Sequence, residues 1–239
     1  MSIPGLNEWL RTPQGRYVLA WEQSKYDEVV ADIFGFNALQ LGMTECAFLH
    51  ANRMPLRLSC DVQGTAEVRA TAEQLPFASA SLDLVVLPHV LEFSANPHQI
   101  LREVERVLVP EGQVVVTGFN PYSLWGVRRL LGGSRAAFPW HGSYLGVLRL
   151  RDWLKLLGFE TQLGSFGCYA PAALREQWLR RWQFMELAGN RWWPIAGAIY
   201  MVQAIKRVHG MRLIQPAWRD RKAQAKALAP VVQRTDRGQ

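Results

Sequence analysis

The chain has 239 residues, 49% of them apolar, and a formal net charge of +7 at pH 7. This length allows one substantial core, with room for an appendage rather than a second full domain. No apolar run reaches the roughly 18 to 20 residues of a membrane span, so we expect no transmembrane helix. The three cysteines lack metal-ligand spacing, and the first residues do not form a secretory signal. We therefore expect reduced thiols and a cytoplasmic protein.

The positive charge belongs to the C-terminal end of the chain. Residues 206–239 hold nine Lys or Arg and two Asp, whereas residues 1–205 hold eighteen of each sign. A basic tail can contact an anionic membrane surface or nucleic acid. Because no aromatic residue follows Trp218, we interpret the tail as a solvated terminus and expect no nucleic-acid partner. A weak membrane-surface contact through the aromatic and basic C-terminal region is the second interpretation.

The first predicted elements are a helix and a strand. Thr12 followed by Pro13 is typical of a helix start, because the hydroxyl caps the first turn and proline fits its first position. The helix then carries an apolar face up to Gly35, formed by Tyr17, Val18, Trp21, Tyr26, Val29, Val30 and Ile33. Residues 36–41 are predicted as the first strand, and Gly42 opens the turn after it.

The next two strands are predicted at residues 56–60 and 67–70, with Asp61 at the end of the former. Only residues 62–66 separate Asp61 from the second of these strands. A parallel crossover needs about a dozen residues, so the usual intervening helix is missing. Either the two strands form an antiparallel hairpin at the sheet edge, or one of them is wrongly assigned.

The strongest pattern in the chain is a strand, a helix and a second strand. Residues 82–87 and 114–116 are short apolar runs that suit strands covered on both faces. Pro97 suits the first turn of the helix between them, with Ser94 or Asn96 as the cap. The helix carries one apolar stripe, formed by Ile100, Leu101, Val104, Val107 and Leu108. Parallel strands joined in this way indicate an α/β sheet.

The second half is rich in aromatic residues and helical patterns. A helix with Arg128 and Arg129 facing outward is predicted after a turn at Asn120, with a break at residues 132–134. A helix at 151–157 leads into a strand at 159–163. An amphipathic helix at 174–188 and a final strand at 199–206 follow, and eight of the ten tryptophans lie between positions 125 and 218.

These segments divide the chain into three predicted parts. Residues 1–35 form an N-terminal helical segment, and residues 36–206 form the main domain. That domain contains a helical and aromatic insertion at about 120–195. Residues 207–239 form the basic tail.

Three stretches carry a family resemblance: the run from Ala72 to Phe77, the strand from Leu82 to Val86, and the run from Leu101 to Gly112. In this order and spacing they resemble the later motifs of class I S-adenosylmethionine-dependent methyltransferases, and in particular the type 11 small-molecule domain. The resemblance implies a Rossmann-like α/β sheet, mostly parallel with an antiparallel last strand. In this chain that sheet is shortened at the edge formed by strands 2 and 3.

The cofactor loop departs from the pattern of the family it resembles. That pattern places an acid and three glycines at positions 40, 42, 44 and 46, and here these are Gln40, Gly42, Thr44 and Cys46. Gln40 can donate a hydrogen bond but cannot neutralise an ammonium group. The added side chains leave two alternatives, a loosened cofactor site or a loop that satisfies its own hydrogen bonds.

The resemblance also implies the remaining cofactor residues. The carboxylate of Asp61 would accept both ribose hydroxyl protons, although a turn-forming Asp is the alternative. The predicted S-adenosylmethionine-binding residues are Gln40, Gly42, Asp61, Thr71, Ala72 and Leu87. No metal is expected, because the five histidines show no paired ligand spacing.

His89 is the candidate general base, since it is the only group near the predicted rim that titrates near neutral pH. A histidine at this position can equally be structural. The predicted substrate contacts follow the strand at 114–116, at Phe119, Asn120, Tyr122 and Trp125.

Two functions remain open from the sequence. The first is in-line methyl transfer to a small, apolar or aromatic molecule. The second is a methyltransferase-like fold that has lost the cofactor and serves as a binding or regulatory module. The altered loop motivates the second, and the intact later motifs motivate the first. The sequence does not predict the oligomeric state.

Overall fold

The computed structural model describes residues 5–131, 138–172, 177, 181–182, 184–193 and 195–207. Three sequence predictions lie wholly or partly outside these residues: the break at 132–134, the amphipathic helix at 174–188, and the basic tail from residue 208 onward. None of the helices in the described ranges is long and apolar enough to cross a membrane.

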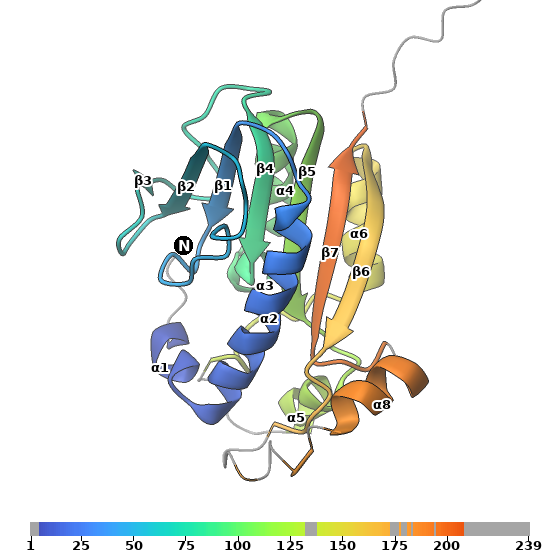
Figure 1. Cartoon of the computed structure of the whole chain (residues 1–239). Helices are drawn as coiled ribbons and strands as arrows, with labels where there is room; N and C mark the ends of the chain where they lie inside the picture. The colour runs from blue at the N-terminus through green and yellow to red at the C-terminus, as the bar shows by residue number, and fades with distance from the viewer. Residues whose placement is uncertain are drawn as a thin grey trace, which may run out of the picture. The chain divides into compact units, whose positions relative to one another are not determined.

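A single seven-stranded sheet forms the centre of the fold, with the strand order β3-β2-β1-β4-β5-β7-β6 (Figure 1). Its strands are β1 (Asn37–Leu41), β2 (Leu56–Asp61), β3 (Val68–Arg69), β4 (Leu82–Pro88), β5 (Leu108–Phe119), β6 (Phe159–Gly167) and β7 (Ile199–Lys206). β7 runs antiparallel to both of its neighbours, β5 and β6, whereas the pairings among β1 to β5 are all parallel. The predicted mostly parallel sheet with an antiparallel last strand is confirmed.

Helices cover both faces of this sheet (Figure 1). They are α1 (Leu6–Leu10), α2 (Pro13–Ala31), α3 (Val90–Phe93), α4 (Pro97–Val107), α5 (Leu124–Leu131), α6 (Val147–Leu156) and α8 (Phe184–Trp192). Alternate residues of the strands point to opposite faces. Leu39 and Val85 therefore join one apolar cluster with α4 and α6, while Ala38 and Val86 join another with α1 and α2.

α2 begins and packs as its sequence predicts. The hydroxyl of Thr12 accepts a hydrogen bond from the backbone N–H of Gly15 at 3.1 Å, and Pro13 occupies the first turn. Val18, Tyr26 and Val30 of the predicted apolar face are buried against the sheet. The indole of Trp21 lies against the backbone of β6, where a Cβ added at Gly167 would come within 2.0 Å of the ring nitrogen. Close approach of this helix to the sheet therefore requires glycine at position 167.

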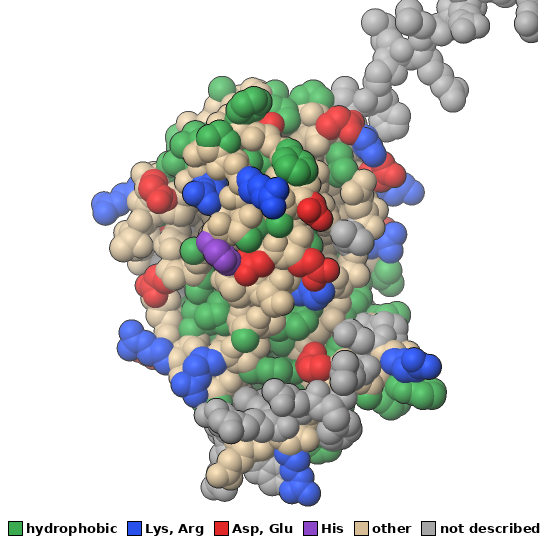
Figure 2. All heavy atoms as spheres, viewed as in Figure 1, with side chains coloured by type: hydrophobic (Ala, Val, Ile, Leu, Met, Phe, Trp, Pro, Cys, Tyr) green, Lys and Arg blue, Asp and Glu red, His purple; other side chains and the backbone are tan. Residues whose placement is uncertain are grey.

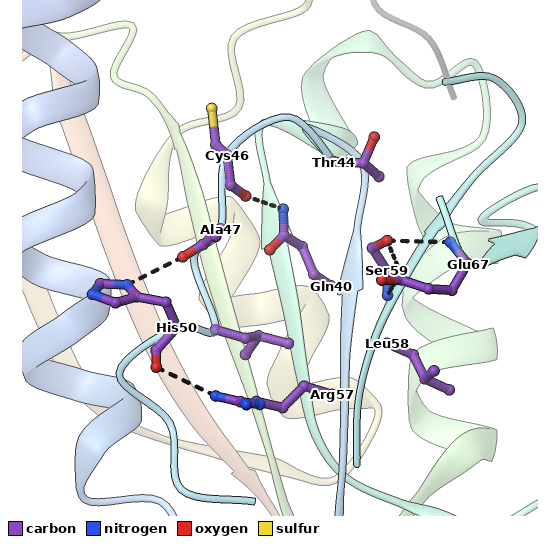
Figure 3. Close-up of a pocket in the computed structure, with 10 residues that line it drawn as sticks. Gln40, Thr44, Cys46, Ala47, His50, Arg57, Leu58, Ser59 and Glu67 are labelled. Carbon is purple, nitrogen blue, oxygen red and sulfur yellow. Dashed lines mark hydrogen bonds between the residues drawn. The ribbon is translucent and has the colours of Figure 1, made fainter. Parts of the chain in front are cut away.

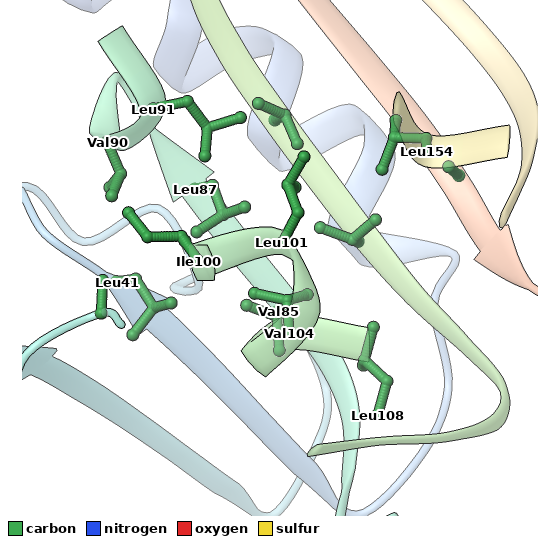
Figure 4. Close-up of a cluster of buried hydrophobic side chains, with 14 of the residues drawn as sticks. Leu41, Val85, Leu87, Val90, Leu91, Ile100, Leu101, Val104, Leu108 and Leu154 are labelled. Carbon is green, nitrogen blue, oxygen red and sulfur yellow. The ribbon is translucent and has the colours of Figure 1, made fainter. Parts of the chain in front are cut away.

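The β4–α4–β5 unit is the most regular part of the molecule (Figure 4). Ile100, Leu101, Val104 and Val107 of α4 are fully buried against β1, β4 and β5. Asn96 occupies the cap position but its side chain makes no capping bond; instead, Ser94 Oγ accepts from the Asn96 N–H at 3.0 Å. The expected helix and both strands are present.

The connection between β1 and β2 contains no helix in the structure. Residues 42–55 form a series of turns and bends that lie on the α2 side of the sheet. The amide of Asn52 anchors the far end of this segment, donating to the carbonyl oxygens of Val30 at 2.7 Å and Ile33 at 3.0 Å. Near its start, the carboxylate of Glu45 accepts a hydrogen bond from the side-chain amide of Asn7 at 2.6 Å.

The second and third strands do not form the antiparallel hairpin, which was one of the two alternatives left open for them. β3 pairs with β2 in parallel, through the partners Cys60–Val68 and Asp61–Arg69. A crossover as short as residues 62–67 suffices because β3 contains two residues and pairs only with the last two of β2. The strand 2–3 edge is shortened, as expected.

Of the two arginines of α5 that were predicted to face outward, Arg128 is exposed and Arg129 is not. Arg129 is half-buried, with its guanidinium 4.8 Å from the centre of the Tyr144 ring and its Nε donating to the carbonyl of Trp140 at 3.1 Å. Arg128 is exposed, but it lies over the Trp140 ring at 5.1 Å. The arginines thus fasten the helix to the aromatic loop at 138–146, and the outward face of α5 is apolar.

Candidate functional site

The candidate site lies at the edge of the sheet where β1, β2 and β4 end, which we call the carboxyl edge. Ligands of parallel α/β sheets bind at this edge, where the strand order reverses. In this sheet the reversal falls between β1 and β4. Both strands are followed by backbone in the left-handed region, at Gly42 with φ 75° and His89 with φ 54°.

Gly42 and Asp61 are brought together at the carboxyl edge. The Gly42 N–H donates to the carbonyl of Cys60 at 2.9 Å, which places the turn after β1 beside the last residue of β2. A Cβ at Gly42 would lie 3.1 Å from Val90, and the positive φ disfavours any other residue. Asp61 is buried, and its Oδ1 accepts from the Val62 N–H at 2.6 Å. The turn-forming role of Asp61 is therefore present in the structure.

Gln40 organises the loop that follows β1. Its side-chain amide donates to three carbonyl oxygens, of Gly42 at 3.2 Å, Met43 at 3.0 Å and Cys46 at 2.8 Å. Its Oε1 accepts from the backbone N–H of Phe48 at 3.1 Å. Because Gln40 is buried and bonded inward at both ends, the loop at residues 42–48 satisfies its own polar groups.

A cavity of about 310 Å³ lies beside this loop, on the α2 side of β1 and β2 (Figure 3). Polar side chains supply much of its wall, including Gln40, Cys46, Arg57, Ser59 and Glu67. The cavity occupies the region between the irregular β1–β2 connection and the strands. Of the predicted cofactor residues, Gln40 lines it, whereas Gly42 and Asp61 are not among its lining residues.

The groups in this cavity are already partnered or unreactive. Glu67 accepts from the Ser59 N–H at 2.7 Å, and Arg57 donates to the carbonyls of His50 at 3.3 Å and Asn52 at 3.1 Å. Burial, reinforced by the carboxylates of Glu22 and Glu45, raises the pKa of Cys46 to about 11. Its thiol is therefore protonated at neutral pH, and the cavity is better suited to binding than to nucleophilic chemistry.

The other predicted cofactor residues occupy three different environments. Thr71 is exposed, and its carbonyl accepts from the Gln74 N–H at 3.1 Å in the loop after β3. Ala72 and Leu87 are buried in the apolar cluster on the α4 side of the sheet. The side chain of Leu87 therefore points away from the face that carries Gln40.

His89 lies in the interior, between two carboxylates. Its Nε2 is 2.8 Å from Oε1 of Glu22 on α2, and its Nδ1 is 2.9 Å from Oε2 of Glu92 on α3. The backbone N–H of Phe119 donates to the other oxygen of Glu92. All three titrating side chains are at most 2% exposed. The cluster therefore joins α2, the end of β4, α3 and β5 in one ionic network.

The network fixes the charge of the imidazole. Burial by itself lowers the pKa of His89, but Glu22 and Glu92 outweigh it and raise the pKa to about 10. Burial raises the pKa of Glu92 above its ordinary value. This raised pKa favours the imidazolium at neutral pH, whereas a histidine acts as a general base from its neutral form. The predicted catalytic role stays a prediction, and the geometry is that of a buried ion pair.

Three of the four predicted substrate residues are buried. The Phe119 ring lies 4.4 Å from that of His89. Asn120 uses its amide to hold the backbone before β7, donating to the carbonyls of Ile195 at 2.7 Å and Gly197 at 2.9 Å. Trp125 donates from its indole to the Ala170 carbonyl at 2.9 Å. Tyr122 is exposed and lies between them in sequence, so it is the member of the set that can meet a ligand without rearrangement.

Sequence reasoning missed the carboxylates that face His89. Glu22 falls four residues after Val18 and four before Tyr26, so it lies on the buried stripe of α2. A charged residue at an apolar position of this kind is a signal for a buried partner. Glu92 follows His89 by three residues, the spacing at which side chains meet on one side of a helical turn. Among the residues that the structure describes, no group of three or more His, Cys, Asp or Glu is placed to hold a metal ion.

Residues 20–116 match a protein family described as a methyltransferase domain. The chain is 32% identical over 161 residues to the uncharacterized protein YafS of Escherichia coli K12, a match that covers 64% of this chain and 65% of that protein. It is 31% identical over 125 residues to an uncharacterized methyltransferase of Mycolicibacterium vanbaalenii, covering 44% of this chain and 48% of the relative. Each match thus spans less than two thirds of the relative's own length.

The fold is similar to solved structures of enzymes that use S-adenosylmethionine. A methyltransferase of this kind from Thermotoga maritima superposes with a TM-score of 0.61 at 17% identity. The superposition covers 84% of this chain and 96% of that structure. At this identity the likeness establishes the fold alone.

Proposed function

We propose that the chain is a class I S-adenosylmethionine-dependent methyltransferase that transfers a methyl group from this cofactor to a small apolar or aromatic molecule. The observation that carries the proposal is the placement of Gly42 beside Asp61 at the carboxyl edge. These two residues are the parts of the family's cofactor pattern that survive in the early half of the sheet. The match over residues 20–116 supports the same conclusion.

The nucleoside end of the cofactor fits the residues present. Asp61 ends β2 at the carboxyl edge, where a carboxylate can accept the two ribose hydroxyl protons. Its Oδ1 already accepts a local backbone bond at 2.6 Å, and such a bond orients a carboxylate without exhausting its lone pairs. The short β3 leaves this edge of the sheet less covered than a full-length strand would.

The methionine end fits less well. Gln40 stands where the family has an acid, and its amide is committed to the loop at residues 42–48. A neutral amide cannot balance the ammonium group of the cofactor. Binding therefore depends mainly on the nucleoside half, and the loop contributes its backbone rather than a charged side chain.

The bound cofactor would supply an electrophilic methyl group for displacement in line with its sulfur. The chain's own contribution is to position the acceptor and to exclude water, and positioning alone supplies roughly 7 to 11 kcal/mol in well-oriented reactions. Tyr122 is the exposed residue at the rim that we assign to acceptor contact. The buried rings of Phe119 and Trp125, whose centres are 6.3 Å apart at an interplanar angle of 18°, act as a rigid aromatic support.

His89 serves this site by holding elements in place. It joins α2 and α3 to the end of β4 through Glu22 and Glu92. An acceptor whose nucleophile carries no proton at neutral pH, or loses it readily, would need no base from the protein. The buried imidazolium is consistent with such an acceptor.

Calorimetric titration with S-adenosylhomocysteine tests the proposal. We expect binding to the wild-type protein, and a loss of about tenfold or more in affinity on Asp61→Ala, because hydrogen bonds to a charged group contribute about 1.5 to 3 kcal/mol. Asp152→Ala is the matched control, since Asp152 is an exposed carboxylate on α6, away from the candidate site. It should leave the affinity unchanged. Absence of heat up to millimolar ligand with a folded protein would refute cofactor binding.

The second candidate function is a binding module built on the same fold. The self-satisfied loop around Gln40 favours it, because a loop that fills its own hydrogen bonds does not need a cofactor to be ordered. The polar cavity of about 310 Å³ would then be the ligand site. The same titration separates the two candidates, since the module would not bind S-adenosylhomocysteine.

A further inference from the structure

One helix of this protein presents its apolar side to solvent. Leu124, Val127, Leu130 and Leu131 of α5 are 48% to 82% exposed. At 100° per residue these four positions fall within one third of the helix circumference. They form a continuous strip, which we call the α5 stripe. Scattered exposed leucines are common, but a continuous strip of them on one helix marks an interaction surface.

The rest of α5 is committed to the protein, so the helix cannot rotate to bury the stripe. Trp125 is fully buried and bonded to Ala170. Gly126 packs so tightly that an added Cβ would lie 2.0 Å from the carbonyl oxygen of Pro121. Arg129 is held by Tyr144 and by the carbonyl of Trp140. The outward orientation of the stripe is therefore fixed by contacts on the opposite side.

A second group of exposed apolar residues belongs to the same end of the molecule. Trp192 and Trp193 at the end of α8, and Ile195 after it, are 63% to 70% exposed. This segment is tied to the start of α5, because the Asn120 amide donates to the Ile195 carbonyl at 2.7 Å. Figure 1 shows α5 and α8 at the end of the sheet toward which β4 and β5 run, which is the carboxyl edge.

The charge around these residues is positive. On α5 itself Arg128 is exposed, and the helix contains no Asp or Glu. The carboxylate of α8, Glu186, is half-buried and accepts from the Tyr169 N–H at 2.9 Å, so it is turned toward the protein. Arg191, in the last turn of α8, is exposed. Figure 2 shows apolar side chains next to a basic one over α8, at the lower right.

We propose that the α5 stripe, together with Trp192, Trp193 and Ile195, docks on the surface of an anionic lipid bilayer. Exposed leucines and tryptophans flanked by arginines are the composition of helices that lie in a membrane interface. Anionic headgroups complement the arginines, while the leucines and tryptophans enter the boundary between headgroups and acyl chains. Lipid binding here is independent of methyl transfer. It would also bring the carboxyl edge close to a source of apolar acceptors.

Vesicle sedimentation of the full-length chain tests this proposal. We expect the wild-type protein to sediment with mixed phosphatidylcholine–phosphatidylglycerol vesicles, and much less with pure phosphatidylcholine vesicles. The double variant Leu130→Glu/Leu131→Glu places two carboxylates on the stripe and should reduce the bound fraction about tenfold. Both side chains are exposed, so the fold is expected to persist, and circular dichroism checks this.

The matched control is Phe34→Glu/Leu156→Glu. These side chains are 74% and 85% exposed, and they lie near the opposite edge of the sheet, before β1 and before β6. The control adds the same charge and removes similar apolar surface, so it should bind vesicles as the wild type does. A third variant, Trp192→Glu/Trp193→Glu, should lower binding in the same direction as the α5 variant.

Three results would overturn the proposal. The wild type could fail to bind anionic vesicles. The α5 variant could bind as well as the wild type, which would assign lipid binding to the basic tail, since that variant leaves residues 208–239 intact. Light scattering could show a wild-type dimer that the α5 variant converts to a monomer, which would make the stripe an interface between two copies of this chain. None of these outcomes depends on whether the protein binds S-adenosylhomocysteine.

Discussion

The two sides of the β1–β4 junction are stabilised in different ways. On the later side, β4, α4 and β5 form a regular unit in which one helix buries four apolar side chains against parallel strands. On the earlier side, β1, β2 and β3 are joined by irregular segments, at residues 42–55 and 62–67. Buried apolar area stabilises the first region, and buried amides stabilise the second.

Two side-chain amides and one carboxylate hold the irregular segment and the start of β1 in place. Gln40 holds the near end of the β1–β2 connection through four hydrogen bonds. Asn52 holds its far end to the last turn of α2, and its Oδ1 also accepts from the Met54 N–H at 2.9 Å. Asp83 fixes the start of β1 by accepting from the N–H groups of Phe36 and Asn37, each at 2.9 Å. A parallel sheet can therefore dispense with a crossover helix when side chains satisfy the backbone that the helix would have satisfied.

The largest effect is expected where the two regions are joined. His89→Ala would leave Glu22 and Glu92 buried without their cation, and breaking a buried ion pair typically costs about 3 to 5 kcal/mol of stability. Urea unfolding measures this loss. Gln99→Ala is the control, because Gln99 is exposed on α4, and its substitution should change stability by no more than about 0.5 kcal/mol. A similarly small change for His89→Ala would contradict the ionic network.

The same network predicts how stability depends on pH. The pKa of His89 is raised from 6.5 to about 10, so its contribution is fully present below pH 6.5 and is lost as the pH rises through 10. The pKa of Glu92 is also raised, so the ionisation of Glu92 likewise makes stability fall as the pH rises, but at lower pH. The free energy of unfolding of the wild type should therefore fall between pH 7 and pH 10. In His89→Gln this decline should be smaller, and an unchanged slope would contradict the assignment.

The next effect distinguishes apolar burial from amide bonding. Ile100→Ala removes a fully buried side chain between α4 and the sheet, and such truncations cost about 2 to 5 kcal/mol. We expect faster hydrogen exchange across β1, β4 and β5 together, because the cluster spans them. Leu130→Ala on the exposed face of α5 is the control, with little change expected. An exchange increase confined to α4 would contradict the shared core.

A smaller and more local effect is expected at Gln40. Gln40→Leu leaves the carbonyls of Gly42, Met43 and Cys46 without their donor, with a cost of about 1 to 3 kcal/mol. Amide exchange should rise at residues 42–48 and remain slow in β4 and β5. Gln63→Leu, at an exposed position, is the control. Faster exchange throughout the sheet would show that the loop is not an independent element.

The difference between the two regions also explains what sequence reasoning could reach. The α4 stripe and the strands on either side of it were predictable, because hydrophobic periodicity encodes burial against a sheet. The last strand was predicted at residues 199–206 and is found there. The connections of β1 and β2 were not predictable, since they depend on amides such as Gln40 and Asn52, whose partners are distant carbonyls with no sequence signature.

The candidate site could be predicted from the sequence only in part, for the same reason. Gly42 and Asp61 could be named from a turn glycine and an acid after a strand, and they do lie together. The carboxylates around His89 could not be predicted from the sequence, because Glu22 belongs to a helix and lies 67 residues earlier in the chain. The face that α5 presents was predicted only in part, since Arg128 is exposed but Arg129 packs on the ring of Tyr144 in a later loop.

Hydrogen–deuterium exchange of the wild type with and without S-adenosylhomocysteine tests the central claim most directly. We predict slower exchange at residues 42–46 and 61–63, which flank the carboxyl edge, and no change in α6. Protection confined to the strands and loop that line the polar cavity, or no protection anywhere, would contradict the proposal that this edge still holds the cofactor.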